Sequence, residues 1–141
     1  MKAKDILSHH QLKYSRQREA LIELLQDEDY PMTIDQIVER LRDLKNPMNV
    51  STVYRIVESL FEHQIVDKNY SSVSNSTLIQ LKKSHHHHYL ICQSCHKMIP
   101  LIDCPIHDIV HSIEDKQHFK VISHSLEIIG ICYECQNKAQ V

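Results

Sequence analysis

The sequence predicts an α+β protein, with an N-terminal winged helix-turn-helix followed by a small C-terminal α/β domain. Three observations support this. Apolar residues recur at helical spacing through residues 1–63. Two β-like segments around a polar stretch follow them, as in a β-hairpin. Beyond residue 82, short β-like segments surround one helical stretch and contain two Cys-x-x-Cys pairs. We therefore expect two domains, 1–82 and 83–141, for which the length is sufficient.

The first 63 residues carry the signals of three or four short helices, of which the first lies around Ile6 and Leu7. Polar residues that can cap the next three helices stand at suitable positions. These capping candidates are Ser15, Thr33 with Gln36, and Asn49 or Ser51. The side chains expected on the buried faces are Ala20, Leu21, Leu24, Leu25, Ile34, Ile37, Val38, Leu41, Leu44, Val53, Ile56, Val57, Leu60 and Phe61.

The segments IVDKNY and TLIQLKK flank SSVSNS and read as the wing. In a winged helix the helix before the wing enters the DNA major groove. Here that helix is NVSTVYRIVESLFEHQ, and its start offers Ser51, Thr52, Tyr54 and Arg55. Hydroxyls suit phosphate oxygens, and an arginine reaches a phosphate or a guanine edge. The alternative is an ordinary exposed helix start.

Composition excludes several classes of protein. A net charge of −2 gives no bulk sign of nucleic-acid binding, so DNA contact must come from a local patch. No apolar stretch reaches the ~20 residues that span a bilayer, and the N-terminus lacks the apolar region of a secretory signal, so we expect a cytoplasmic protein without membrane contact. The single glycine, Gly130, excludes a Gly-rich phosphate loop and nucleotide-dependent chemistry.

The C-terminal part contains the β-like segments YLIC, MIPLI and FKVISHSLEIIGIC around the helical stretch PIHDIVHSIED, with Pro105 as the expected first helical residue. Its two Cys-x-x-Cys pairs are Cys92 with Cys95 and Cys132 with Cys135. Two such pairs complete a closed tetrahedral zinc site, which stabilises a small domain. A redox role would need a thioredoxin-like setting, which is absent from this sequence. The fifth cysteine, Cys104, is expected to be a small buried residue, with a metal role as the alternative.

Four consecutive histidines, residues 85–88, precede the first cysteine. On an extended strand their side chains alternate, so His86 and His88 face one side while His85 and His87 face the other. More imidazoles follow at His107, His111, His118 and His124. Imidazole-rich sites favour zinc, nickel or copper over magnesium, calcium or manganese. The alternative is a solvated histidine tract with weak, incidental metal affinity.

The chain resembles the ferric uptake regulator family of bacterial metal-sensing repressors over nearly its whole length. The resemblance rests on YSRQREALIELL, NVSTVYRIVESL, the histidines leading into LICQSC, and SHSLEIIGICYEC. It implies a homodimer whose protomers each join a winged helix to an α/β dimerisation domain and bind palindromic operator DNA when loaded with metal. Within the family, the four-histidine run and the CPI at 104–106 resemble features of the zinc uptake regulator branch.

By the same resemblance, the regulatory metal site maps to His86, His88, His107 and His124. The third position is usually acidic in relatives, and a histidine there favours zinc. A second site at the hinge maps to Asp67 and His87, with His85 as a substitute ligand. Tyr89 stands where relatives place a histidine, and the ligand expected near Gln80 is absent. Relatives also have a glycine at the position of Gln64. DNA contact maps to Lys13, Arg16 and Arg18 and to Ser51, Thr52, Tyr54 and Arg55.

The sequence thus predicts a zinc-responsive, homodimeric transcriptional repressor of zinc uptake genes, with Zn²⁺ in a structural and a regulatory site. The alternatives are an iron, manganese or peroxide sensor of the same family, and a zinc-storage module that does not bind DNA. No enzyme activity or small-molecule substrate is expected, because the four-cysteine site is closed and no HExxH motif is present.

Overall fold

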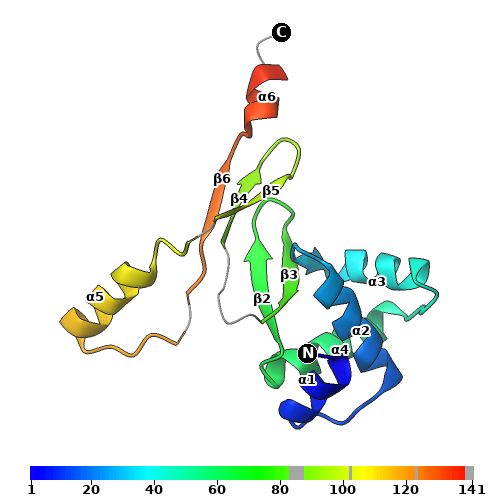
Figure 1. Ribbon diagram of the computed structural model, residues 1–141. Helices are drawn as coiled ribbons and strands as arrows, with labels where there is room; N and C mark the ends of the chain where they lie inside the picture. Colours follow the sequence, from blue (N-terminus) through cyan, green and yellow to red (C-terminus); the bar gives the residue numbers. More distant parts are fainter. Residues whose placement is uncertain (83–87, 102, 123, 139–141) are drawn as a thin grey trace. The chain divides into compact units, whose positions relative to one another are not determined.

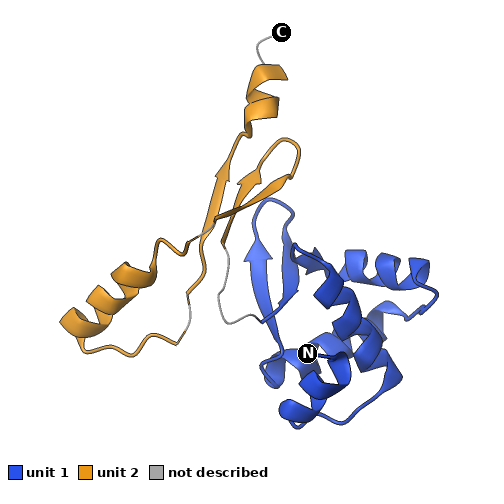
Figure 2. Cartoon of the chain, in the orientation of Figure 1, with its two compact units in different colours: residues 1–83 blue, residues 84–141 orange. Residues whose placement is uncertain are grey.

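The computed structural model describes residues 1–141 except 83–87, 102, 123 and 139–141. The chain divides into two compact units, Met1–Lys83 and Ser84–Val141 (Figure 2). Unit 1 is mainly helical and ends in a β-hairpin, whereas unit 2 is built on a small sheet (Figure 1). The predicted α+β class is confirmed. None of the helices in the described ranges is long and apolar enough to cross a membrane.

Unit 1 has a short helix, three longer helices and a three-stranded sheet. Its elements are α1 (Ala3–His9), α2 (Arg16–Asp27), β1 (Met32–Thr33), α3 (Ile34–Asp43), α4 (Val50–Glu62), β2 (Val66–Ser71) and β3 (Ser76–Leu81). The sheet order is β1-β3-β2, with antiparallel neighbours. The wing is therefore the β2–β3 hairpin. The two-residue β1 was not predicted, since so short a segment has no readable periodicity.

Side chains cap three of these helices at the predicted positions. The Ser15 side chain accepts a hydrogen bond from the Arg18 amide, and Thr33 forms a reciprocal capping box with Gln36. For α4 the cap is Asn49, whose Oδ1 accepts the Thr52 amide at 2.9 Å. Each cap satisfies an amide that the helix itself leaves without a partner, and contributes about 1 kcal/mol.

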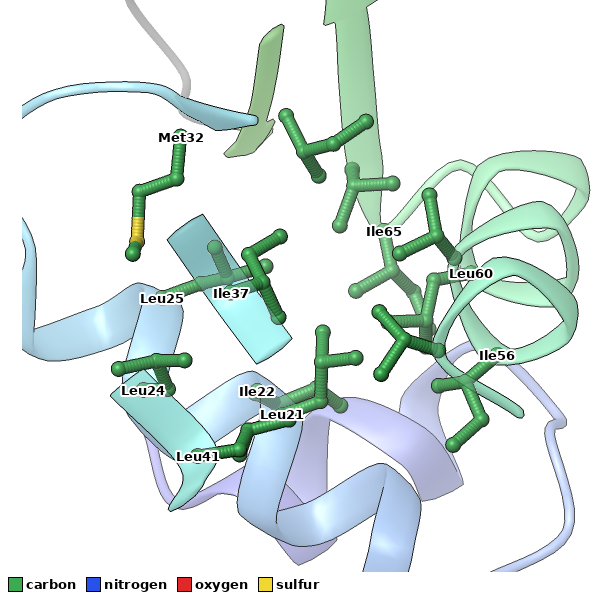
Figure 3. Close-up of a cluster of buried hydrophobic side chains, with 14 of the residues drawn as sticks. Leu21, Ile22, Leu24, Leu25, Met32, Ile37, Leu41, Ile56, Leu60 and Ile65 are labelled. Carbon is green, nitrogen blue, oxygen red and sulfur yellow. The ribbon is translucent and has the colours of Figure 1, made fainter. Parts of the chain in front are cut away.

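The hydrophobic core of unit 1 lies between α2, α3, α4 and the wing. Figure 3 shows Leu21, Ile37 and Leu60 meeting from three different helices. The prediction that Leu44 and Phe61 lie in the core is wrong, because Leu44 is 55% exposed and Phe61 is 43% exposed. Leu44 caps the C-terminal end of α3, beyond its buried stripe. The Phe61 ring instead lies under the Lys68 ammonium, 4.4 Å from its centroid.

The described residues of unit 2 form a three-stranded sheet and two helices. Its elements are β4 (His88–Cys92), β5 (Met98–Leu101), α5 (His107–Gln117), β6 (Glu127–Gly130) and α6 (Tyr133–Lys138). The order is β5-β4-β6, with β5 antiparallel and β6 parallel to β4. Pro100 fits β5 because this is an edge strand. The crossover that contains α5 makes the parallel pairing of β4 and β6 feasible.

Three sequence expectations for unit 2 differ from the structure. Pro105 precedes α5, which begins at His107. Among the described residues of the segment FKVISHSLEIIGIC, only Glu127–Gly130 form a strand, β6. The α6 helix was not predicted, because its six residues lack an amphipathic repeat and carry no buried side chain. Short elements of this kind are fixed by their tertiary neighbours rather than by local pattern.

Unit 2 buries few hydrophobic residues within one chain. Among the described residues, its buried apolar side chains are confined to β4: Tyr89, Ile91 and Cys92. Several large apolar side chains stay exposed, namely Ile99, Ile109, Ile113, Phe119, Ile122, Ile128, Ile129, Ile131 and Tyr133. So small a core cannot stabilise a domain unaided, so unit 2 needs metal ions, a second copy of the chain, or both.

Candidate metal centres and nucleic-acid interface

The four-thiol cluster forms where two parallel strands end. Cys92 ends β4, and its register partner on β6 is Gly130, two residues before Cys132. The Gln93 amide donates to the Gly130 carbonyl at 2.8 Å and so joins the ends of the two strands. The two Cys-x-x-Cys pairs consequently meet, and the sulfur atoms of Cys92, Cys95, Cys132 and Cys135 all lie within 4.8 Å of one another.

The first pair lies in the turn that joins β4 to β5. The Cys92 amide donates to the Lys97 carbonyl at 3.0 Å, and the His96 amide donates to the Cys92 carbonyl at 2.9 Å. His96 has a φ of 65°, in the left-handed region that closes the turn. Cys135 lies on α6, whose first turn follows Cys132 directly. The β4–β5 turn therefore supplies two thiols to the cluster, and the start of α6 supplies the other two.

The spacing of the thiols suits a tetrahedral zinc ion. Cys95 Sγ lies 3.8 Å from Cys132 Sγ. Zn–S bonds of about 2.3 Å at tetrahedral angles place neighbouring sulfur atoms about 3.8 Å apart. Four thiolates without other ligand types favour zinc or an iron–sulfur centre over hard cations. The donor set and its spacing therefore fit a closed zinc site, and bound zinc would cross-link the β4–β5 turn to the start of α6.

The pKa values of the thiols reflect their crowding. The Cys132 amide donates to Cys92 Sγ at 3.4 Å and lowers the pKa of the Cys92 thiol to about 6. The Cys132 side chain, together with burial, raises the pKa of the Cys135 thiol to about 12. The Cys92 thiol thus loses its proton easily, and the Cys135 thiol loses its proton with difficulty. A dication favours the thiolate form of both, so metal binding there displaces protons.

A second cluster lies at the opposite end of the same sheet. His88 begins β4, and His124 precedes β6 by three residues. Their Nε2 atoms lie 3.2 Å apart. Cys104 joins them, with its Sγ 3.3 Å from His88 Nε2 and 3.4 Å from His124 Nε2. His88 is buried, whereas Cys104 and His124 are half-buried.

Two of the four residues expected at the regulatory site are in this cluster. His107 is on the exposed face of α5, where its ring lies against the His111 ring with centroids 4.6 Å apart. His107 does not belong to the cluster of His88, Cys104 and His124. His86, like His85 and His87, lies outside the described residues. Cys104 is the cluster member that sequence reasoning treated only as an alternative.

Of the residues expected at the hinge site, Asp67 lies within the described part of the chain, whereas His85 and His87 do not. Gln80 and Tyr89, the other two positions considered for this site, are also described. Asp67 lies on β2 and pairs in register with Gln80 of β3, near which the family resemblance leads us to expect another ligand. Tyr89, where the family resemblance leads us to expect a histidine, is buried in the central strand β4. It pairs in register with Pro100 on one side and Glu127 on the other.

The start of α4 is presented as a DNA-recognition helix would require. Its buried side comprises Val53, Ile56, Val57 and Leu60. Ser51, Tyr54 and Arg55 are exposed, and Thr52 is half-buried. The buried stripe therefore fixes the helix while its other face remains free to meet a nucleic acid.

The second basic segment lies around the start of α2. Lys13 and Arg16 are exposed, and Arg18 is half-buried. The Arg18 guanidinium donates from Nη1 to the Lys13 carbonyl at 2.5 Å, so it also holds the loop before α2. Among the three basic residues predicted here, Lys13 and Arg16 are therefore better placed than Arg18 to contact phosphate.

A winged helix joined to a small domain with two cysteine- and histidine-rich clusters defines a DNA-binding metalloregulator. The chain belongs to the ferric uptake regulator family, whose model matches residues 9–129. Members of this family are dimeric, metal-responsive, DNA-binding transcriptional repressors and not enzymes. The resemblance inferred from the sequence is thus confirmed at the level of the family.

Individual relatives agree with this assignment. The ferric uptake regulation protein of Campylobacter upsaliensis is 32% identical over 142 residues, which cover 99% of this chain and 90% of that protein. The structure of the Helicobacter pylori ferric uptake regulator, described as having three functional metal-binding sites, has a TM-score of 0.75 at 26% identity and covers 94% of this chain and 88% of its own. A zinc uptake regulator complexed with zinc and DNA has a TM-score of 0.66 at 21% identity, with coverages of 99% and 93%, and shares the fold.

Proposed function

We propose that this protein is a zinc-responsive homodimeric repressor that binds palindromic operators and controls zinc uptake genes. One observation supports zinc above the others: in both described clusters every ligand is a thiol or an imidazole, without a carboxylate. Thiolate ligands favour zinc, carboxylate oxygens suit manganese, and imidazole suits zinc and iron alike.

The two clusters have different roles in this proposal. Zinc bound by Cys92, Cys95, Cys132 and Cys135 is structural and stabilises unit 2, whose own hydrophobic core is small. Zinc at the histidine cluster is regulatory. Because a ligand shifts an equilibrium only through differential affinity, this second zinc must bind the DNA-competent arrangement more tightly than the alternatives.

The burial pattern of unit 2 supports homodimerisation. In a single chain its isoleucines and aromatic side chains stay exposed, and exposed apolar surface of this kind is typical of protein–protein interaction sites. A two-fold dimer would bury such a surface against itself and would place two α4 helices on two half-sites. A palindromic operator is the DNA counterpart of that symmetry.

An iron sensor is the second candidate, because the curated relatives are named ferric uptake regulation proteins. Loading the protein with Fe(II), adding peroxide and searching for oxidised histidines by mass spectrometry distinguishes the two. Oxidation of His88 or His124 at a rate well above that of the exposed His111 would favour iron or peroxide sensing.

The experiment that tests the proposed function starts with selection of binding sites from random duplex DNA at saturating zinc. The selected duplex is then used in a DNA-shift assay with zinc, Fe(II) and Mn(II). Zinc should give DNA binding at concentrations where the other two metals give little. Equal DNA affinity with and without every metal would overturn the proposal, and selective activation by Fe(II) would assign the protein to iron.

A further inference from the structure

The antiparallel and parallel neighbours of β4 bring three side chains to one edge of the sheet. His88 opens β4 and pairs in register with Leu101, the last residue of β5. Cys104 follows three residues later. Because β6 runs parallel to β4, the residues before β6 reach the same edge, and His124 lies among them. Residues separated by 16 and 20 positions from Cys104 thus converge on its sulfur atom.

From this convergence, we propose that Cys104 is a ligand of the regulatory metal and supplies a thiolate at the site of His88 and His124. This inference rests on the proposed function, since it names a ligand of the same regulatory site. The family resemblance gave His107, and not Cys104, as a ligand of this site.

The mutual distances favour metal ligation over simple hydrogen bonding. The three donor atoms form a triangle with sides of 3.2, 3.3 and 3.4 Å. Each imidazole Nε2 carries one in-plane proton or lone pair, so it cannot serve two partners that lie about 60° apart. Ligands around one tetrahedral zinc ion lie about 3.3 Å apart for two nitrogens and about 3.6 Å apart for nitrogen and sulfur. All three atoms can satisfy that arrangement together.

The chemistry of this donor set gives the site its selectivity. A thiolate is a soft ligand that selects zinc, whereas a carboxylate suits manganese and other hard ions. The burial of His88 and half-burial of Cys104 and His124 limit water access to the metal. Two histidines and one cysteine leave one position of a tetrahedral ion for a further ligand, and the described residues do not identify it.

Cobalt spectroscopy of the full-length chain tests the proposal. The four-cysteine site is first filled with zinc, whose retention is checked by metal analysis, and one equivalent of Co(II) is then added. Wild type and His107→Ala should show a thiolate-to-cobalt charge-transfer band in the near-ultraviolet, and Cys104→Ser should lose it. Cys104→Asp should still bind cobalt without that band. No band in wild type with one cobalt bound, or an undiminished band in Cys104→Ser, would overturn the proposal.

Alkylation gives a second readout that does not depend on a spectrum. With one zinc per protomer, iodoacetamide should modify Cys104; with two, Cys104 should be protected, as measured by peptide mass spectrometry. Cys104→Ser should weaken the second zinc by about 100-fold or more, since loss of a group that merely supports a ligand already costs about 10–100-fold. Equal alkylation of Cys104 at one and two zinc ions would contradict ligation.

The outcomes separate this inference from the proposed function. If Cys104→Ser keeps wild-type zinc affinity and zinc-dependent DNA binding, the ligand assignment fails while the zinc-responsive repressor stands. If wild type binds DNA equally with and without metal, the proposed function fails whatever the cobalt spectrum shows. Circular dichroism of Cys104→Ser should match wild type, because the substitution changes one half-buried atom.

Discussion

His88 and Cys92 occupy the two ends of β4, so one five-residue strand carries a ligand-type side chain into each of two clusters. At the rise of an extended strand the two residues are about 13 Å apart. The thiol cluster gathers where β4 and β6 end, and the His88, Cys104 and His124 cluster gathers where they begin. Both clusters therefore take a side chain from the same strand.

The first prediction concerns the thiol cluster. Cys132→Ser removes one of the four sulfur atoms, and the protein should lose its chelator-resistant zinc. Because unit 2 has little hydrophobic core and structural zinc contributes about 10 kcal/mol or more to small zinc domains, unit 2 should unfold and the dimer should dissociate. Zinc content and sedimentation velocity measure these effects.

Cys104→Ser is the matched control for this change, since it removes a thiol from the other cluster. It should retain one tightly bound zinc per protomer and remain dimeric. A Cys132→Ser protein that keeps both its resistant zinc and its dimeric state would show that the four thiols do not hold the structural metal.

The second prediction concerns the recognition helix. Arg55→Ala removes an exposed guanidinium from the first half of α4 and should weaken operator binding by about 1–3 kcal/mol without changing stability. DNA-shift titrations at fixed salt and zinc measure the first effect, and thermal unfolding measures the second. A zinc-storage protein would keep its function in this variant.

Lys116→Ala is the charge-matched control, because Lys116 lies on α5 in the other unit and is also exposed. It should leave operator affinity within experimental error of wild type. Equal losses in both variants would indicate a bulk charge effect and would remove Arg55 from the interface.

The third prediction concerns the residue before the wing. Gln64 has a φ of 59°, the left-handed conformation that glycine adopts without strain. The family resemblance leads us to expect glycine at this position. Gln64→Gly should raise the free energy of unfolding by about 0.5–1 kcal/mol, after allowance for the greater entropy of glycine in the unfolded chain. Urea unfolding of the zinc-loaded protein measures the gain.

Gln64→Ala supplies the comparison for that variant. Alanine keeps the Cβ atom and therefore the strain, so it should give no comparable gain. If alanine stabilises the protein as much as glycine does, the left-handed backbone is not the cause.

Sequence reasoning located the features that depend on near neighbours. The caps at Ser15 and Asn49 and the capping box at Thr33 involve side chains and amides three residues apart, so the local pattern contains them. The β2–β3 wing was likewise readable from two strand-like segments around a turn. The start of α5 was misplaced because Pro105 suits a first helical turn but stands two residues too early.

Features that depend on distant parts of the chain were harder to predict. The two Cys-x-x-Cys pairs were readable because each pair is local and two pairs complete one site. Cys104 has no such local partner: His88 and His124 reach it only through the β5-β4-β6 order of the sheet. The available signal was its position just after a strand that pairs with the histidine-bearing strand, and a single sequence does not give that pairing.

The central claim is that a removable zinc controls DNA binding, and a chelation cycle followed by fluorescence anisotropy tests it most directly. The zinc-saturated protein should contain two zinc ions per protomer and bind its selected operator duplex. Mild chelation should remove one zinc and abolish binding, and zinc alone among zinc, Fe(II) and Mn(II) should restore it. Unchanged operator affinity after the loss of that zinc would contradict the account.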